Sequence, residues 1–255
     1  MKLSSLEIKY LGQCGFLIET KKSRIVTDPY LSYSVDRDHY CEQTPWVRLY
    51  PPPCRLSEIR PDVVLISHEH DDHLNPETIL ECLNAGQDPI FVIPAPIRYM
   101  LTDLGISDSR IIDAHSERPI VIGDCEIVPI PCAHTDFHLD EGGAFFELSY
   151  IIKFPDATVF FGGDMSMYDG LCERLSREKI DLLLLPCNGR DDERTSKGII
   201  GNITETEAAS LSADLNVPFV AMHHDLYAIN ACSEDTISSA AASAGAEVIF
   251  LKPGL

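Results

Sequence analysis

Residues 67–74 read Ser67-His68-Glu69-His70-Asp71-Asp72-His73-Leu74 and place three histidines and an aspartate in the spacing HxHxDH. The apolar, β-branched run from Val63 to Ser67 leads into the histidines and predicts a buried strand. Asn75-Pro76-Glu77 follows it, and a capping residue with proline at the first helical position predicts the start of a helix. We therefore expect the cluster in a loop between a strand and a helix.

The residue types in this loop point to metal binding. A turn at the end of a strand can aim His68 and His70 at one ion, and Asp72 with His73 at a second. Imidazole and carboxylate ligands suit zinc, iron or manganese. The alternative is a solvated polar loop, which histidines at this fixed spacing disfavour.

The composition indicates a folded domain without affinity for polyanions. Of the 255 residues, 45% are hydrophobic and 24% charged, which provides apolar surface for a sizeable core, so we expect residues 1–255 to form a single domain. The formal net charge of −20 repels nucleic acid and anionic lipid. The expected partner is a small-molecule substrate, with no nucleic acid and no membrane, and homo-oligomerisation stays open.

The start of the chain and its cysteines indicate the cytoplasm. Residues 1–9 lack the uninterrupted apolar stretch of a signal peptide, and no later run is long enough to span a membrane. The nine cysteines are scattered singly, without CxxC spacing, and are interpreted as reduced core thiols. Cys132 lies two residues before His134 and is also considered as a ligand, although a small buried hydrophobic residue is favoured there.

The order of the predicted elements indicates the fold class. Residues 6–11, 16–20 and 24–27 are β-rich and separated by turn residues, which predicts an antiparallel meander. Residues 31–61 lack periodicity, and we expect a long loop that acts as a lid. Further strands are expected at 90–93, 110–113, 120–130, 145–154, 157–162, 181–185, 218–222 and 247–251, and helices at 96–104, 168–178, 204–214 and 234–244. Two stretches of sheet separated by helices predict an α/β protein, α+β in some schemes, built as a four-layer αββα sandwich.

With this cluster and this order of elements, the chain resembles the metallo-β-lactamase superfamily over nearly its whole length. The resemblance implies the fold of that family and three further metal ligands. The first matches His134, which ends the strand-like run Val128-Pro129-Ile130-Pro131, with His138 as a rival farther from the strand. The second matches Asp164 after Gly162-Gly163, as a carboxylate that bridges two ions.

The third implied ligand lies in Met222-His223-His224-Asp225 and matches His223. His224 then faces the substrate or supports the ligands, and the choice between the two histidines stays open. Asp28, in Val26-Thr27-Asp28-Pro29-Tyr30, matches the family's first motif, an aspartate that holds the ligand histidines by hydrogen bonds. The alternative for Asp28 is a simple Asp-Pro turn.

This ligand set implies hydrolysis with two divalent ions, manganese or zinc, and iron is also compatible. Two ions bridged by water lower the pKa of that water from about 15.7 to near 7, so no serine or cysteine nucleophile is needed. The expected reaction is attack by the bridging hydroxide. Asp72 orients the nucleophile, and His224 is a second catalytic candidate.

Three further stretches suggest a substrate. Tyr10-Leu11-Gly12-Gln13-Cys14-Gly15-Phe16, Asp28-Pro29-Tyr30-Leu31 and the His-His-Asp ending resemble the branch that contains L-ascorbate-6-phosphate lactonase, which implies a lactone. In residues 188–197, Arg190, Arg194 and Lys197 are candidates to clamp a phosphate. Three acidic neighbours make a solvated charged loop equally compatible. Tyr227 is a further candidate contact, with a packed aromatic ring as the alternative.

Three other functions compete with this prediction. A phosphodiesterase or nuclease would use the same ions, but the net charge and the lack of room for a nucleic-acid domain oppose it. A flavodiiron-type oxidoreductase usually has glutamate where His70 stands and carries a flavin domain. A non-catalytic binding module would have lost ligands, whereas this chain has a candidate for every one.

Overall fold

The first half of the chain forms one sheet whose strands begin antiparallel and end parallel. A computed structural model describes residues 1–255. The sheet has the order β1-β2-β3-β4-β5-β6-β7, antiparallel as far as β4 and parallel from β4 onward. Its strands are β1 (Lys2–Leu3), β2 (Leu6–Gly12), β3 (Gly15–Glu19), β4 (Arg24–Thr27), β5 (Val63–Leu65), β6 (Ile90–Pro94) and β7 (Ile111–Ala114). The antiparallel meander predicted for the first thirty residues is confirmed.

The second half repeats this plan in the order β14-β13-β12-β11-β10-β9-β8. Pairing is antiparallel from β8 to β11 and parallel from β11 to β14. The strands are β8 (Ile120–Ile122), β9 (Cys125–Pro131), β10 (Leu148–Lys153), β11 (Thr158–Phe161), β12 (Leu182–Pro186), β13 (Phe219–Met222) and β14 (Val248–Ile249). The single strand expected at 120–130 is wrong, because Gly123, with a φ of +61°, and Asp124 turn the chain into a β8–β9 hairpin.

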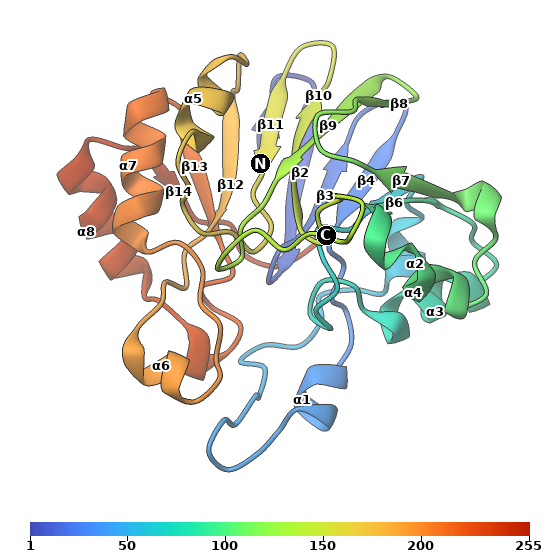
Figure 1. Ribbon diagram of the computed structural model, residues 1–255, viewed down its shortest axis with the longest axis horizontal. Helices are drawn as coiled ribbons and strands as arrows, with labels where there is room; N and C mark the ends of the chain where they lie inside the picture. The colour runs from blue at the N-terminus through green and yellow to red at the C-terminus, as the bar shows by residue number, and fades with distance from the viewer.

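Helices cover the outer face of each sheet, as Figure 1 shows. On one side lie α2 (Leu56–Ile59), α3 (Pro76–Asn84) and α4 (Arg98–Asp103), and on the other α5 (Leu171–Ser176), α7 (Glu205–Leu215) and α8 (Glu234–Ala244). Apolar residues form one large cluster between the sheets and one between each sheet and its helices. The predicted four-layer αββα sandwich is confirmed.

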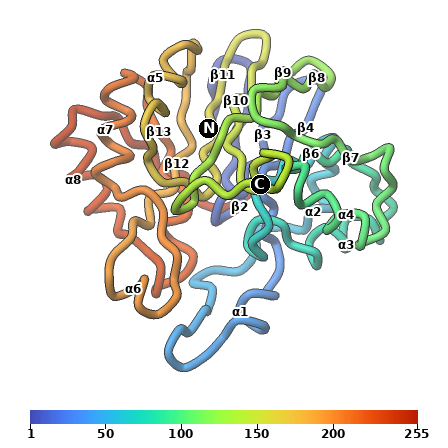
Figure 2. The backbone as a smooth tube through the Cα atoms, viewed as in Figure 1, coloured from blue at the N-terminus to red at the C-terminus, as the bar shows by residue number.

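Short helices lie in segments that we expected to be loops. They are α1 (Ser34–Asp38) and α6 (Asp192–Ser196), together with the 3-10 turns η2 (Asp108–Arg110) and η3 (Ala228–Asn230), whereas the 3-10 turn η1 (Ala95–Ile97) begins the helix expected at 96–104. Elements of three to five residues are too short to show a hydrophobic period. Figure 2 shows α1 and α6 on excursions of the chain away from the sheets. None of the helices combines the length and hydropathy that crossing a bilayer requires.

The helix predicted after the histidine cluster begins where expected. Asn75 caps α3 by accepting a hydrogen bond from the Thr78 backbone N–H at 3.0 Å, and Pro76 occupies the first turn. β5 ends at Leu65, two residues earlier than predicted, because the Ser67 N–H donates to Asp28 Oδ1 at 2.7 Å. The cluster thus lies in a loop fixed at both ends.

The two sheets are joined next to this loop by contacts between β10 and the residues after β5. The buried Tyr150 hydroxyl donates to the Ile66 carbonyl at 2.7 Å, and the Leu148 N–H donates to the Ser67 carbonyl at 3.0 Å. A loop that follows a strand of one sheet is therefore held against a strand of the other.

The Tyr150 hydrogen bond is expected to stabilise the fold measurably. Tyr150→Phe should lower the free energy of unfolding by about 1–2 kcal/mol, because the buried Ile66 carbonyl loses its hydroxyl donor. Urea denaturation followed by circular dichroism measures this change. Tyr99→Phe, at a ring that is 55% exposed, is the matched control and should leave stability unchanged. Equal stability of both variants would show that the bond contributes nothing.

Candidate metal centre

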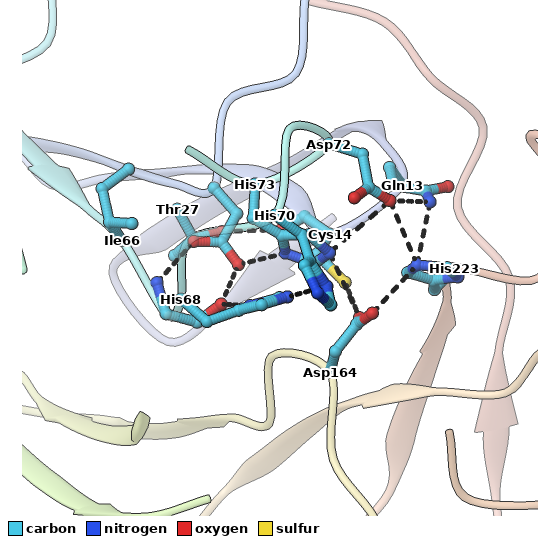
Figure 3. A network of polar contacts seen from close by, with 12 residues as sticks. Gln13, Cys14, Thr27, Ile66, His68, His70, Asp72, His73, Asp164 and His223 are labelled. Atoms are coloured by element: carbon cyan, nitrogen blue, oxygen red, sulfur yellow. Dashed lines mark hydrogen bonds and ion pairs between the residues drawn. The ribbon is translucent and has the colours of Figure 1, made fainter. Parts of the chain in front are cut away.

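The predicted ligands come together because they all follow strands that end at the same edge of the sandwich. Asp28 follows β4, residues 68–73 follow β5, His134 follows β9, Asp164 follows β11 and His223 follows β13. Figure 3 shows residues from both sheets facing one another across this edge. We call the following seven residues the metal cluster: His68, His70, Asp72, His73, His134, Asp164 and His223.

One group within the metal cluster contains three imidazoles. His68, His70, His134 and Asp164 each place a ligand atom within 4.8 Å of the others. His68 Nε2 lies 2.9 Å from His70 Nδ1, and His134 Nε2 lies 3.4 Å from Asp164 Oδ2. Three nitrogens and a carboxylate oxygen form a ligand set typical of zinc or another transition metal.

The second group contains Asp72, His73 and His223. Asp72 Oδ2 lies 3.6 Å from His73 Nε2 and 3.5 Å from His223 Nε2. Both of these nitrogens also lie 3.3 Å from a carboxylate oxygen of Asp164. Asp164 therefore stands between the two groups.

Asp28 determines which nitrogen of the neighbouring histidines faces the metal cluster. Its Oδ2 lies 2.7 Å from His73 Nδ1 and 2.5 Å from Ser67 Oγ, and its side chain is completely buried. Since the Ser67 hydroxyl donates to Asp28, it can only accept from His68 Nδ1, which is 2.9 Å away. His73 and His68 then keep their Nε2 lone pairs for a metal ion, which is the role expected of Asp28.

A buried nitrogen atom without a partner indicates that a metal ion fits the cluster. His73 Nε2 is buried and has no hydrogen-bond partner, although it lies next to carboxylates of Asp72 and Asp164. An unpartnered buried polar atom is costly, by about 1–3 kcal/mol. A divalent cation would satisfy this nitrogen and neutralise the two carboxylates, so the residues fit a metal.

The pKa values of these groups reflect the concentration of charge. Burial tends to lower the pKa of His73, but Asp164, Asp72 and Asp28 raise it well above its usual value. Burial also tends to lower the pKa of His223, but the carboxylates of Asp164 and Asp72 outweigh it and raise this pKa to about 9. Burial and the charges of His73 and His70 hold the pKa of His68 well below its usual value. The second group attracts cations, and a metal ion would compete with protons there.

Three residues of the site were missed by the sequence analysis. Gln13 Nε2 donates to Asp72 Oδ2 at 2.6 Å and lies 2.8 Å from His223 Nε2. Cys14 Sγ lies 3.6 Å from Asp164 Oδ1, and Ser67 connects Asp28 to His68. Gln13 and Cys14 lie in the stretch Tyr10–Phe16 that carried the family resemblance, but nothing in that stretch assigned them a role. In the structure Gln13 has a φ of +56°.

Glycine allows the Asp164 loop to approach Ser67. Gly163 has a φ of +61°, and a Cβ atom there would lie 2.8 Å from Ser67 Cβ. Any side chain would therefore push Asp164 away from the residues that follow β5.

A cavity of about 370 Å³ opens beside the metal cluster. Its lining includes Asp72, His70, His134, Asp164 and His223, together with further residues from four loops. These further residues are Val35, His39, Trp46, Glu69, Asp71, Gly198, Ile200, Tyr227 and Asn230. A volume of this size is typical of a small-molecule site.

The segment 31–61, expected to be a lid, forms one wall of this cavity. The buried Arg48 holds it in place by donating to the Ser32 carbonyl at 2.7 Å and to the Tyr50 carbonyl at 3.2 Å. The Leu49 N–H also donates to the Leu226 carbonyl at 2.9 Å. The segment is therefore held next to Tyr227, which belongs to the cavity lining but is buried and packs against Trp46, as the alternative of a packed aromatic ring predicted.

Other predicted residues lie outside the cavity. His224 is buried, with Nδ1 3.3 Å from the Cys232 carbonyl and its ring centroid 5.7 Å from that of Phe250. The His224 ring does not line the cavity. The backbone at His223 has a φ of +57°, and of the two adjacent rings only that of His223 faces the metal cluster. His138, the rival of His134, has a side chain that is 62% exposed and lies 3.7 Å from Glu147.

The three cations predicted to clamp phosphate are also absent from the lining. Each is paired with a carboxylate of its own neighbourhood. The pairs are Arg190–Glu207 at 2.6 Å, Arg194–Asp191 at 2.5 Å and Lys197–Glu193 at 2.7 Å. This is the arrangement expected of the alternative, a solvated charged loop.

Comparison with known proteins identifies the family. The chain belongs to the β-lactamase superfamily, since the family model described as a beta-lactamase superfamily domain matches residues 7–223. A metallo hydrolase from Ignicoccus hospitalis has the same fold, with a TM-score of 0.70 at 20% sequence identity over 98% of this chain and 96% of that one.

Two relatives illustrate the range of lengths. A UPF0173 metal-dependent hydrolase of Pyrobaculum neutrophilum is 23% identical over 252 residues, which is 98% of each chain. An uncharacterized protein of Mycobacterium tuberculosis is 26% identical over 185 residues, which is 72% of this chain and 49% of that relative. The match thus spans about half the length of the mycobacterial protein.

The role of Asp28 generates a prediction for metal affinity. Asp28→Asn should weaken binding of Mn²⁺ or Zn²⁺ by about 10- to 100-fold, because an amide no longer fixes the proton of His73 on Nδ1. Isothermal titration calorimetry of the metal-depleted protein measures the affinity. Asp156→Asn is the control, because Asp156 accepts hydrogen bonds from Ser5 in an exposed position. An Asp28→Asn protein that is folded and binds metal like the wild type contradicts the proposed orientation.

Proposed function

We propose that this chain is a single-domain hydrolase that uses two divalent metal ions to cleave a small-molecule ester, namely a lactone. The observation that carries the proposal is the position of Asp164. Its carboxylate lies 3.4 Å from His134 Nε2 in one ligand group and 3.3 Å from both His73 Nε2 and His223 Nε2 in the other. A carboxylate shared by two nitrogen-rich groups is suited to bridge two cations.

Each group would hold one ion. His68, His70 and His134 would bind the first, and Asp72, His73 and His223 the second, with Asp164 between them. Manganese and zinc are the preferred metals, and iron accepts the same ligands. The Pyrobaculum relative, named a metal-dependent hydrolase, supports the reaction class.

The bound ions would supply an acidic water at neutral pH and polarise the substrate oxygen. Asp72 lines the cavity, and its side chain is 21% exposed, so it can orient the attacking water. Gln13 donates to Asp72 Oδ2 and fixes that carboxylate. Asp72 is thus the residue of the chain that acts on the nucleophile.

Water is the nucleophile because the nearby cysteines are unsuited to the task. Burial raises the pKa of the Cys14 thiol well above its usual value, and the charge of Asp164 adds to the effect. Burial likewise raises the pKa of Cys132. Both remain neutral thiols at physiological pH, whereas a nucleophilic cysteine must be a thiolate.

A lactone as substrate agrees with the size of the cavity and with the sequence resemblance. The cavity of about 370 Å³ accepts a small molecule, and the stretches around Gln13 and His223 resemble the lactonase branch. In the reaction, the water oxygen forms a bond to the carbonyl carbon and the ring C–O bond breaks. One proton passes to the departing oxygen, and a hydroxy acid is formed.

The test is hydrolysis of a substrate panel by the protein loaded with Mn²⁺ or Zn²⁺. The panel contains aliphatic and aromatic lactones, sugar lactones and phosphodiesters. We expect lactone hydrolysis that is lost on chelation and lost by at least about 100-fold in His134→Ala, because that substitution removes a nitrogen from the first ligand group.

His138→Ala is the matched control and should stay within about twofold of wild type, because this imidazole is exposed and outside the metal cluster. Phosphodiester hydrolysis without lactone hydrolysis would replace the substrate class. Metal-loaded protein that cleaves nothing in the panel, or a His138→Ala variant that loses activity while His134→Ala keeps it, would overturn the assignment.

A further inference from the structure

Besides the metal cluster, the lining of the cavity has an apolar part, which we call the apolar wall. It consists of Val35 on α1, Trp46, Ile200 and Tyr227, from three separate segments of the chain, of which Val35 and Tyr227 are buried and Ile200 is 47% exposed. The Trp46 and Tyr227 rings meet edge to face, with centroids 5.1 Å apart. Tyr227 is held by a 2.7 Å hydrogen bond between its hydroxyl and that of Tyr30. This wall is a fixed surface for an apolar group.

The cavity is lined by the carboxylates Glu69, Asp71, Asp72 and Asp164. Its basic residues are histidines alone, since none of the 14 lining residues is lysine or arginine. Asp72 and Asp164 face the proposed ions. The carboxylates of Glu69 and Asp71 do not face the proposed ions, so they repel an anionic part of a substrate that is not bound to a metal. His39 Nε2 lies 2.6 Å from Asp71 Oδ2 and is the neighbour of that carboxylate.

The cations of the 188–197 segment are not available to offset this charge. Arg190 donates two hydrogen bonds to the Glu207 carboxylate, at 2.6 and 2.7 Å. Arg194 is bound both to Asp191 and to the Asn188 carbonyl. A substrate phosphate would have to break such pairs, and the two arginines would then leave carboxylates unpaired.

We infer that the substrate is an uncharged lactone whose ring substituent is apolar, and that phosphorylated lactones are excluded. This inference rests on the proposed function and specifies its substrate class. The lactone carbonyl faces the metal cluster, and its alkyl or aryl substituent lies against Trp46, Tyr227 and Ile200. A phosphate at the same position would meet an apolar wall with acidic neighbours.

The experiment compares γ-lactones that differ only in the substituent: propyl, phenyl and phosphonooxymethyl. For the metal-loaded protein we expect kcat/KM to be at least about tenfold higher for propyl and phenyl than for the phosphorylated lactone, because an unpaired charge in an apolar site is costly. Equal or higher kcat/KM for the phosphorylated lactone overturns the inference and leaves hydrolysis intact.

A charge inserted into the wall provides a second readout. Ile200 is 47% exposed, so Ile200→Lys should fold and should raise kcat/KM for the phosphorylated lactone by about two- to fivefold while lowering it for propyl. Ile200→Gln controls for side-chain length. Val121→Lys, at a 73% exposed position on β8 outside the cavity, controls for net charge and should change neither value. The inference fails if Val121→Lys and Ile200→Lys have the same effect.

A binding measurement distinguishes failure of this inference from failure of the proposed function. Trp46 is the only tryptophan of the chain, so its fluorescence reports ligands in the cavity. If no lactone is hydrolysed, the proposed function fails, and equilibrium titration of the metal-loaded protein still decides the preference. Saturable quenching by the phenyl lactone at concentrations at least about tenfold below those needed for the phosphorylated one supports the inference. Quenching by neither, or preferentially by the phosphorylated lactone, overturns it.

Discussion

The buried carboxylate of Asp28 is the interaction on which the rest of the site depends. It receives hydrogen bonds from the Ser67 N–H and hydroxyl and lies 2.7 Å from His73 Nδ1. The backbone at Asp28 has a φ of +32°, which costs about 1–3 kcal/mol outside glycine and persists only where surrounding contacts impose it. These bonds join the ends of β4 and β5 and orient two imidazoles at the same time.

The sandwich separates a rigid part of the site from an adaptable one. The metal cluster lies directly after strands of both sheets, whose ends are tied together by the Tyr150 hydroxyl and the Ile66 carbonyl. The apolar wall of the cavity instead comes from three connections: the one that contains α1, the one that follows α6 and the one that follows β13. Residues that closely follow the strands of a packed sheet can be held to the precision that metal binding needs, while longer loops can vary and so change the substrate. This division explains why the family motifs identify the ion site more readily than the substrate.

Sequence reasoning predicted the parts of the site that are encoded locally. His68, His70 and His73 share one loop, and their spacing was enough to indicate a metal site, whereas Asp28 and Asp164 were implied by the resemblance to a known family. The same reasoning preferred His134 to His138, and the structure brings only His134 into the metal cluster. The sandwich followed from the order of strands and helices, although the β8–β9 hairpin and the short helices were missed.

The remaining features depend on contacts between distant residues. Gln13 meets Asp72 and His223 across 59 and 210 positions of the chain, and no local pattern records such contacts. Arg190 looked available in the sequence because its partner, Glu207, lies 17 residues away on α7. His224 looked equivalent to His223 because the two are adjacent, yet the backbone turn at His223 directs the rings to different surroundings.

The number of metal ions bound per chain tests the central claim most directly. Metal-depleted protein is titrated with Mn²⁺ or Zn²⁺, dialysed, and assayed by inductively coupled plasma mass spectrometry. Two ligand groups joined by Asp164 predict about two ions per chain for the wild type and fewer for Asp164→Ala. A folded wild-type protein that retains no ion, or only one, would contradict the two-metal centre.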